Sequence, residues 1–296
     1  MIDDVLKFFR TLDSKDLRIL TGIEIGMKNF EWVPIEEIRK YTKLSFEQLE
    51  YRLFKLYKSN IVVGTKTPYE GYQIYFDGYD ALALNTFVKR GVVSAIGDEI
   101  GVGKESVVHE AIQEPELAIA DPIPVIIKFH REGRTSFKSV KRVRDHLVDR
   151  EHFSWIYAAR LAAKREYDIM QTLYGKISIP KPIDHNRHAI VMAPAKGSIL
   201  VKTRLLEPEW VLDEILSQIK IVYSEGIIHS DLSEYNIFVS DEGVEFIDWP
   251  QYVTVEHPHA DELLERDVFN VLTHFRRKYN LEKDLNEVIS QIKEDV

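Results

Sequence analysis

The stretch His229-Ser230-Asp231-Leu232-Ser233-Glu234-Tyr235-Asn236 is followed, after a short turn, by Val244-Glu245-Phe246-Ile247-Asp248-Trp249-Pro250. Asp231 and Asn236 lie five residues apart, and Asp248 ends a run that is typical of a strand. Mg²⁺ prefers carboxylate and amide oxygens, which two adjoining loops can supply together. The pattern predicts that Asn236 and Asp248 hold a metal ion and that Asp231 orients or deprotonates an acceptor group.

This spacing resembles that of protein kinases, where H-R-D-L-x-x-x-x-N carries the catalytic Asp and D-F-G carries a metal ligand. Phosphoryl transfer needs such a set because a metal ion must neutralise the charge that develops on the γ-phosphoryl group. A chance loop with Asp, Asn and Asp is the alternative. It is disfavoured because the glycines, the lysine and the glutamate that a kinase also requires precede the motif in the expected order.

A glycine-rich segment, Gly101-Val102-Gly103-Lys104-Glu105-Ser106, separates two strand-like runs. It is not a P-loop, because Asp98 stands where the first glycine is required and Glu105 follows the lysine. It is not a dinucleotide fingerprint either, because no helix is predicted to follow it. A glycine turn between strands suits a flap whose backbone N–H groups cover nucleotide phosphates, and a purely structural hairpin is the alternative.

Lys128 interrupts the apolar run 125–129, where a buried ammonium group needs an anionic partner. The helix predicted over 154–174 can supply that partner. Glu166 has small or apolar residues one turn before and after it, which places it on the buried face, whereas Asp168 has polar neighbours at the same offsets. The spacing favours Glu166 as the partner of Lys128, and a lysine that extends from a strand edge into solvent is the alternative.

The first 91 residues are predicted to form three short helices followed by a hairpin. These elements are a helix over 14–27 capped by 14–16, a helix over 34–41, a helix over 45–57, and strands over 61–64 and 72–76. This order indicates a winged helix. On the third helix the leucines form a buried stripe, and four outward residues are candidates for nucleic-acid contacts: Gln48, Tyr51, Arg52 and Lys55.

The charge of each part of the chain limits the partners that we expect. Residues 1–91 hold 14 basic and 13 acidic residues, a net charge of +1, so a winged helix that binds protein is an alternative to one that binds nucleic acid. Residues 92–296 hold the other 25 basic and 35 acidic residues, a net charge of −10. Such an acidic body argues against nonspecific coating of nucleic acid.

We expect an α+β protein in which a winged helix over 1–91, including a connecting helix that ends at Gly91, precedes a trimmed bilobal kinase-like domain over 92–296. Its N-lobe is expected over 92–192, its hinge over 193–197 and its C-lobe over 198–296. The chain has no cysteine, which excludes disulfides and cysteine zinc sites. Without a long apolar run or a basic start, it is expected to be cytoplasmic, with no membrane partner.

Four segments resemble the motifs of RIO atypical protein kinases, in the branch that carries an N-terminal winged helix. They are Gly103-Lys104-Glu105-Ser106, Ile127-Lys128-Phe129-His130-Arg131-Glu132-Gly133-Arg134-Thr135-Ser136-Phe137, the 229–236 stretch, and Ile247-Asp248-Trp249-Pro250-Gln251. With the winged helix they cover nearly the whole chain. The resemblance implies ATP as the cofactor together with Mg²⁺, for which Mn²⁺ could substitute.

The resemblance implies a role for each site residue. Lys128, held by Glu166, contacts the α- and β-phosphates, Asp231 is catalytic, and Asn236 and Asp248 hold the metal. Some family members are thought to pass through a phospho-aspartate at the position of Asp248. The phosphates are contacted by the glycine loop, which comprises Gly101, Gly103, Lys104, Glu105 and Ser106. The adenine strand and hinge correspond to Met192, Ala193 and Ala195.

RIO proteins are similar in acting during maturation of the small ribosomal subunit. The resemblance therefore implies a serine kinase or ATPase that docks on the precursor small subunit and its ribosomal RNA. Residues 131–151 hold 7 basic and 4 acidic residues and resemble the family's loop after the lysine strand. In that loop Thr135, Ser136 and Ser139 could accept autophosphorylation, and a solvated loop without such a role is the alternative.

The chain also departs from ordinary protein kinases. Ser230 replaces the Arg before the catalytic Asp, so no cation is placed there to bind a phosphorylated activation loop. Only 48 residues follow Asp248, which predicts no conventional peptide groove, and the short C-terminal part suits an archaeal member.

Two alternatives to a RIO kinase share part of this sequence pattern. A phosphotransferase of the aminoglycoside-kinase type would need a longer helical insert than 197–225 provides, and it would leave the winged helix unexplained. A nucleic-acid-binding regulator with a degenerate kinase module is the second alternative. It is disfavoured because every residue needed for phosphoryl transfer is present.

Overall fold

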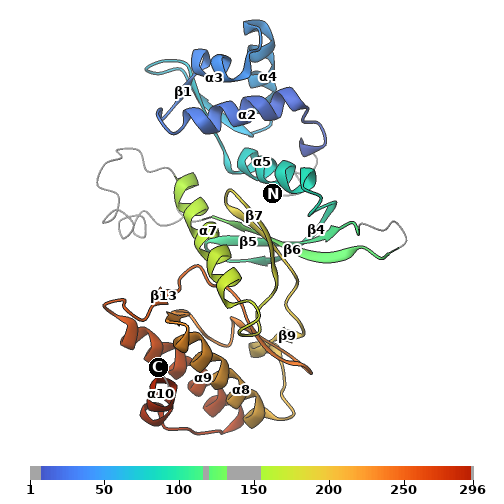
Figure 1. Ribbon diagram of the computed structural model, residues 1–296. Coiled ribbons are helices and arrows are strands. Elements are labelled where there is room, and N and C mark those ends of the chain that lie inside the picture. Colours follow the sequence, from blue (N-terminus) through green and yellow to red (C-terminus); the bar gives the residue numbers. More distant parts are fainter. Residues whose placement is uncertain (1–7, 116–119, 132–154, 295–296) are drawn as a thin grey trace. The chain divides into compact units, whose positions relative to one another are not determined.

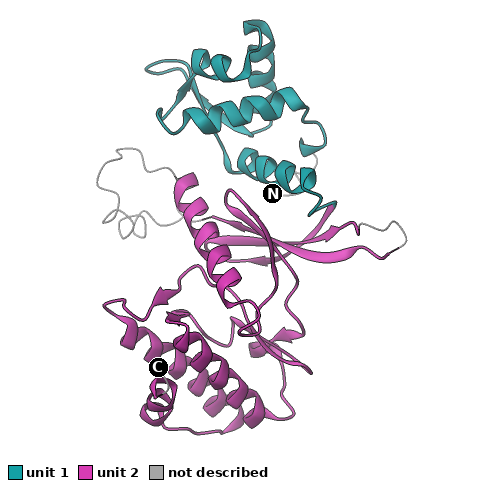
Figure 2. Cartoon of the chain, in the orientation of Figure 1, with its two compact units in different colours: residues 1–94, 136–155 teal, residues 95–135, 156–296 magenta. Residues whose placement is uncertain are grey.

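The computed structural model describes residues 8–115, 120–131 and 155–294. The chain divides into two compact units, one formed by residues 1–94 with 136–155 and the other by 95–135 with 156–296 (Figure 2). Among the described helices, none is both long enough and apolar enough to cross a membrane.

The first unit is the predicted winged helix, followed by one further helix (Figure 1). Its elements are α2 (Ser14–Gly26), β1 (Val33–Pro34), α3 (Ile35–Thr42), α4 (Phe46–Lys58), β2 (Val62–Thr65), β3 (Gly71–Ile74) and α5 (Phe76–Lys89). The strands pair antiparallel in the order β1-β3-β2. Apolar stripes from α2, α4 and α5 are buried together, because their side chains recur every three or four residues.

The start of α2 differs from the prediction by one residue. Asp13, and not the segment 14–16, is the N-cap, and its carboxylate accepts hydrogen bonds from the backbone N–H groups of Lys15 (2.8 Å) and Asp16 (3.0 Å). The Asp16 carboxylate in turn accepts from the Asp13 N–H, which completes a capping box. At α4 the N-cap is Ser45, the first residue of the predicted helix, whose Oγ accepts a hydrogen bond from the Gln48 N–H at 3.3 Å.

The second unit begins with a five-stranded antiparallel sheet in the order β4-β5-β6-β8-β7 (Figure 1). The strands are β4 (Ala95–Val102), β5 (Ser106–Gln113), β6 (Ile123–His130), β7 (Pro182–Asn186) and β8 (Ala189–Met192). Helix α7 (Trp155–Leu173) lies across one face of this sheet. The glycine-rich segment is shorter than predicted, because β4 continues to Val102, so Gly101 belongs to the strand and only residues 103–105 form the turn.

The rest of the second unit is mainly helical, with short strands beside the helices. Its elements are β9 (Ser198–Ile199), η1 (Leu200–Lys202), α8 (Pro208–Ser224), β10 (Ile227–Ile228), β11 (Ile237–Ser240), β12 (Gly243–Phe246), β13 (Val253–Thr254), α9 (Ala260–Tyr279) and α10 (Leu285–Lys293). Gly197 precedes β9 with φ +80°, and a Cβ there would lie 2.0 Å from the carbonyl oxygen of Val239. Only glycine therefore lets the connector pass so close to β11. The predicted α+β class is confirmed.

Candidate active site

Lys128 and Glu166 form a buried ion pair between the sheet and the helix that covers it. Lys128 Nζ lies 2.7 Å from Glu166 Oε1, and their side chains are only 8% and 1% exposed. This is the pair that the helix spacing favours. Burial lowers the pKa of Lys128, but the carboxylates of Asp248 and Glu166 outweigh burial and raise that pKa above its ordinary value. The ammonium group is therefore charged throughout the physiological range.

Glu166 has two further polar contacts, a hydrogen bond from Trp249 and a close approach to the His130 ring. Its Oε1 accepts a hydrogen bond from the Trp249 backbone N–H at 3.1 Å, and its Oε2 lies 2.8 Å from His130 Nε2. Burial alone would raise the pKa of Glu166, yet Lys128 and His130 lower it well below the ordinary range. His130 and Lys128 are two residues apart on β6, so both side chains lie on the same face of the sheet and bind opposite oxygens of one carboxylate.

The β11–β12 hairpin brings Asn236 and Asp248 together. Ile237 pairs with Phe246, so Asn236 faces Ile247, whose N–H donates to the Asn236 carbonyl oxygen at 3.0 Å. Asp248 follows directly, and its Oδ1 lies 2.5 Å from Lys128 Nζ. Asp248 has φ 72°, a left-handed conformation that is strained for a residue with a Cβ. The two predicted metal ligands thus lie at the base of one hairpin, beside the lysine.

The loop over 229–236 carries the predicted catalytic Asp231 and is called the catalytic loop below; it is held by side chains of α9. Asp267 accepts hydrogen bonds from the backbone N–H groups of Ser230 (2.6 Å) and Leu232 (3.0 Å), which flank Asp231. Asn270 Nδ2 donates to the Leu232 carbonyl oxygen at 3.1 Å. Burial raises the pKa of Asp267 to about 7 despite these donors. The backbone on both sides of Asp231 is therefore held by one helix face.

The backbone bends sharply at Ser230, and the next residue, Asp231, is exposed. Ser230 has φ 62°, and its hydroxyl donates to the Gln251 carbonyl oxygen at 2.5 Å, while its own carbonyl accepts from Arg266. Asn236 Nδ2 donates to the Asp231 carbonyl oxygen at 2.8 Å, which closes the loop. Burial raises the pKa of Asp231, and the nearby charge of Asp248 raises it further. A raised pKa suits a group that accepts a proton.

The glycine turn lies at the end of the sheet nearest this cluster. In the β5–β6 register Val108 pairs with Lys128 and Ser106 pairs with His130, so the turn extends just beyond the lysine. The Gly103 N–H donates to the Ser106 carbonyl oxygen at 2.9 Å, which tightens the turn. Lys104 is exposed, and Glu105 accepts from the Arg131 backbone N–H at 2.6 Å.

The predicted hinge follows β8 directly. Lys128 pairs with Ile190 across β6 and β8, which puts Met192 two residues further along the neighbouring strand. The Ala193 N–H donates to the Lys181 carbonyl oxygen at 2.9 Å. The Ala193 carbonyl and the Ala195 amide are the hinge groups that could bind a base, since Pro194 between them has no N–H. Adenine binding there stays a prediction.

The four candidates for nucleic-acid contacts lie on α4, in two different environments. Gln48 is exposed, and Tyr51 is 72% exposed. Arg52 instead pairs with Asp13 (2.7 Å) and Asp16 (2.6 Å), and Lys55 lies 3.3 Å from Asp16. A phosphate group would have to compete with these carboxylates. The role of the four residues stays a prediction.

The sequence reasoning missed His130 and Asp267. His130 could have been found from its position two residues after Lys128, on the same face of the strand. Asp267 lies on the apolar stripe of α9 with Leu264, Val268 and Val271, and a buried acid on such a stripe indicates a specific partner. The proposed phosphorylation sites at Thr135, Ser136 and Ser139 lie outside the described residues.

Comparisons with known proteins identify the family of this chain. A family model for the RIO domain matches residues 107–288, and one for the N-terminal domain of Rio2 matches residues 9–90. The RIO-type serine/threonine-protein kinase Rio2 of Methanocaldococcus jannaschii is 41% identical over 87% of this chain and 94% of its own length. Serine/threonine-protein kinase rio2 of Dictyostelium discoideum is 38% identical over 93% of this chain, which spans only 52% of that relative.

Solved structures give the same result. The crystal structure of a Rio2 kinase–ADP/Mg²⁺–phosphoaspartate complex from Chaetomium thermophilum superposes with a TM-score of 0.83 and 30% identity, over 98% of this chain and 89% of that one. A second Rio2 kinase structure from the same organism gives a TM-score of 0.81 and 31% identity, over 97% and 88% of the two chains. These matches leave no support for a phosphotransferase of the aminoglycoside-kinase type. The chain belongs to the Rio2 branch of the RIO-type serine/threonine protein kinases.

Proposed function

We propose that this protein is an ATP- and Mg²⁺-dependent serine kinase or ATPase that acts in maturation of the small ribosomal subunit. The observation that carries the proposal is the chain of contacts from Glu166 through Lys128 to Asp248, next to a catalytic loop fixed by α9. These residues come from four separate parts of the sequence. Their convergence is what phosphoryl transfer requires, because the reaction depends mainly on positioning and on charge stabilisation.

The residues at the hairpin base fit a magnesium ion. Lys128 contacts only Oδ1 of Asp248, whose side chain is 40% exposed, so Oδ2 is available as a ligand. Asn236 uses its amide nitrogen to bind the Asp231 carbonyl, which leaves its side-chain oxygen for the metal. Both are hard oxygen donors of the kind that Mg²⁺ prefers, and a bound Mg²⁺ would neutralise phosphate charge. The Chaetomium relative, solved with ADP, Mg²⁺ and phosphoaspartate, supports this assignment.

Phosphate binding, orientation of the acceptor and uptake of its proton are carried out by side chains of this protein. Lys128 binds phosphate oxygens and is held for this task by Glu166. Asp231, whose pKa is raised by burial, orients the acceptor hydroxyl or water and takes up its proton. The Asp267 carboxylate keeps the loop around Asp231 in place. The exposed turn at Lys104 and the loop amides cover the phosphates.

We infer that the winged helix docks this enzyme on ribosomal RNA of the precursor subunit. Support comes from the fold itself, in which α4 occupies the position of a recognition helix, and from the exposure of Gln48 and Tyr51 on that helix. The aromatic ring of Tyr51 can stack on an unpaired base. Arg52 and Lys55 contribute only when phosphate groups compete successfully with Asp13 and Asp16.

Two measurements test the proposal. ATP turnover by the purified protein should fall at least about a hundredfold in Asp231→Ala, and full turnover in that variant would reject the assigned roles. Co-sedimentation with small-subunit precursors, with and without ATP, should differ between wild type and Asp248→Ala. The same sedimentation in all four samples would reject the ribosomal part of the proposal.

A further inference from the structure

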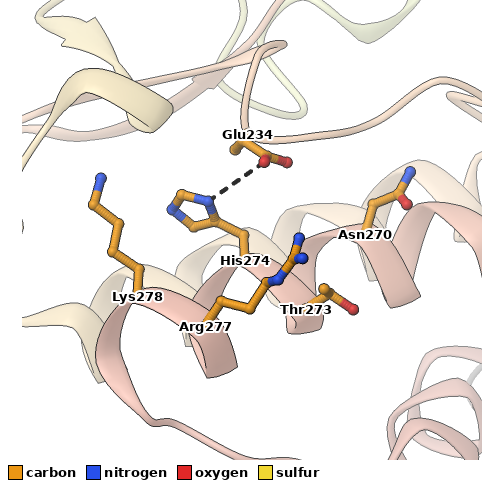
Figure 3. A pocket seen from close by; sticks show the side chains of 6 residues that line it. All are labelled: Glu234, Asn270, Thr273, His274, Arg277 and Lys278. Carbon is orange, nitrogen blue, oxygen red and sulfur yellow. Dashed lines mark ion pairs between the residues drawn. The ribbon is translucent and has the colours of Figure 1, made fainter.

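A polar hollow of about 430 Å³ lies between the catalytic loop and the C-terminal half of α9 (Figure 3). Its lining residues are Glu234, Asn270, Thr273, His274, Arg277 and Lys278. Figure 3 shows Glu234 on the loop above and the other five side chains along the helix. We call this feature the α9 hollow. Glu234 belongs to the loop that carries Asp231 and Asn236, so the hollow adjoins the catalytic site.

The α9 hollow continues the helix face that anchors the catalytic loop. Asp267, Asn270, His274 and Arg277 recur every three or four residues, so they lie along one face of α9. The first two bind the backbone beside Asp231, and the last two line the hollow. Arg277 is seven residues beyond Asn270, about 10 Å along the helix axis. An extended polypeptide covers that distance in about three residues.

The two cationic side chains that line the hollow, Lys278 and Arg277, differ in whether their N–H donors are available to a ligand. Lys278 Nζ donates to the carbonyl oxygens of Val201 (3.0 Å) and Thr203 (2.8 Å) and approaches that of Leu200 (3.4 Å). Its donors are therefore used to hold the η1 turn against α9. Arg277 is exposed, and it has no hydrogen bond or ion pair with any other residue in the described part of the chain. Its guanidinium offers five donors in a geometry that matches carboxylate or phosphate.

His274 supplies a second, independent indication of a ligand. Its side chain is only 7% exposed, and its Nδ1 lies 3.7 Å from Glu234 Oε1. Its Nε2 is buried and has no hydrogen-bond partner among the residues that the structure describes. A buried polar atom of this kind costs free energy until a ligand or water binds it. The ring therefore leaves an unsatisfied polar atom in the wall of the hollow, on the side of the ring that faces Lys278 in Figure 3.

We propose that the α9 hollow binds an acidic side chain of the polypeptide substrate, carboxylate or phosphate, located about three residues from the serine presented to Asp231. This inference rests on the proposed transfer to a serine hydroxyl. Arg277 binds the anion through its exposed guanidinium. A single acidic side chain fits better than RNA, because Glu234 and the net charge of −10 over residues 92–296 repel a polyanion.

A peptide panel tests this site directly. Each peptide carries one serine in an otherwise neutral sequence, with Glu, Gln, Lys or phosphoserine placed two, three or four residues before or after it. Transfer of the γ-phosphate from ATP is measured for each. In wild type, Glu or phosphoserine at one position should raise kcat/KM about tenfold over Gln at that position. Arg277→Gln should remove this preference, and Arg277→Glu should shift it to Lys.

Matched controls separate the hollow from the nucleotide site. Arg276→Gln removes a neighbouring exposed cation that does not line the hollow, and it should keep the acidic preference. Peptide-independent ATP turnover should be unchanged in the Arg277 variants. A carboxylate site and a phosphate site are distinguished by whether Glu or phosphoserine gives the larger gain.

Several outcomes would overturn the proposal. One is equal transfer to Glu and Gln peptides by wild type, and another is a preference that survives Arg277→Gln. If wild type turns over ATP but phosphorylates no peptide, the inference about the hollow fails while the nucleotide site stands. If RNA oligonucleotides bind in an Arg277-dependent manner without any preference for acidic peptides, the occupant is RNA.

Discussion

Lys128 in the proposed nucleotide site and Arg52 in the winged helix are each held by two carboxylates, but the pairs are built differently. Lys128 binds Glu166, which is 1% exposed, and Asp248, which is 40% exposed. The buried partner fixes the lysine, and the exposed partner leaves one side of it accessible. A phosphate can therefore approach this ammonium group while Glu166 keeps it in position.

Arg52 also has one buried and one exposed partner, since Asp13 is 53% exposed, but both of its partners take part in the hydrogen bonds that begin α2. Its buried partner, Asp16, is 0% exposed and belongs to the capping box of α2, and its other partner, Asp13, is the N-cap itself. Hydrogen bonds from Arg52 lower the pKa of Asp13 to about 2, so this carboxylate stays charged near neutral pH. The Arg52 guanidinium, from α4, thus stabilises the N-terminus of α2. The comparison teaches that a cation serves a ligand only where one of its partners can be replaced.

The largest expected difference is between removal of the two cations. Lys128→Met should lower ATP turnover about a thousandfold and the free energy of unfolding by about 3 kcal/mol, because Glu166 is left buried without its partner. Arg52→Met should leave ATP turnover unchanged and cost about 1 kcal/mol of stability. Denaturant titration and a turnover assay measure both effects. Equal losses in the two variants would contradict the comparison.

Asp267 offers a third case for comparison, because this buried carboxylate accepts hydrogen bonds from backbone N–H groups and not from a cation. Burial raises its pKa from 3.8 to about 7, so between these values the folded state keeps a proton that the unfolded state has released. The free energy of unfolding should therefore fall by about 2 to 4 kcal/mol as the pH rises through this window. Asp267→Asn cannot ionise, so its stability should change less between pH 4 and 7. If the free energy of unfolding falls equally with pH in wild type and in Asp267→Asn, a group other than Asp267 causes the pH dependence.

His130 should have an intermediate effect, because it acts on Lys128 only through Glu166. His130→Phe removes the partner of Glu166 Oε2, so the carboxylate can rotate away from Lys128, and the KM for ATP should rise about tenfold. His130→Gln keeps a side-chain N–H donor and should recover part of the loss. ATP kinetics across pH 5 to 8 provide the measurement. An unchanged KM in His130→Phe would show that Lys128 and Trp249 alone hold Glu166.

The smallest effect is expected in the winged helix. Asp13→Asn weakens the hold on Arg52, so affinity for small-subunit RNA should increase about threefold and the salt dependence of binding should steepen by about one counterion. Glu31→Gln is the matched control, since it removes an exposed charge from the same unit. Fluorescence anisotropy at several salt concentrations measures both quantities. Equal gains in the two variants would mean that only the overall charge matters.

Much of the site could be predicted from local sequence patterns. The helical stripe around Glu166 identified the acid that faces the sheet, and the spacing of Asp231 and Asn236 identified the catalytic loop. The winged helix followed from the order of its helices and hairpin. These patterns are visible because side chains recur every 3.6 residues in a helix and every two in a strand. The cap of α2 was wrong by one residue because Asp13 and Ser14 can both cap a helix.

The sequence by itself determined the family and the residues that we propose for the chemistry, since residue types and their order along the chain are sufficient for that. Only the tertiary structure decided that Asp248 is the second partner of Lys128, 120 residues away, and that Asp267 holds the catalytic loop from 37 residues downstream. It also decided the left-handed backbone at Ser230 and Asp248. The physical reason is that such contacts and strained conformations depend on packing between distant segments, which leaves no periodic pattern in the sequence.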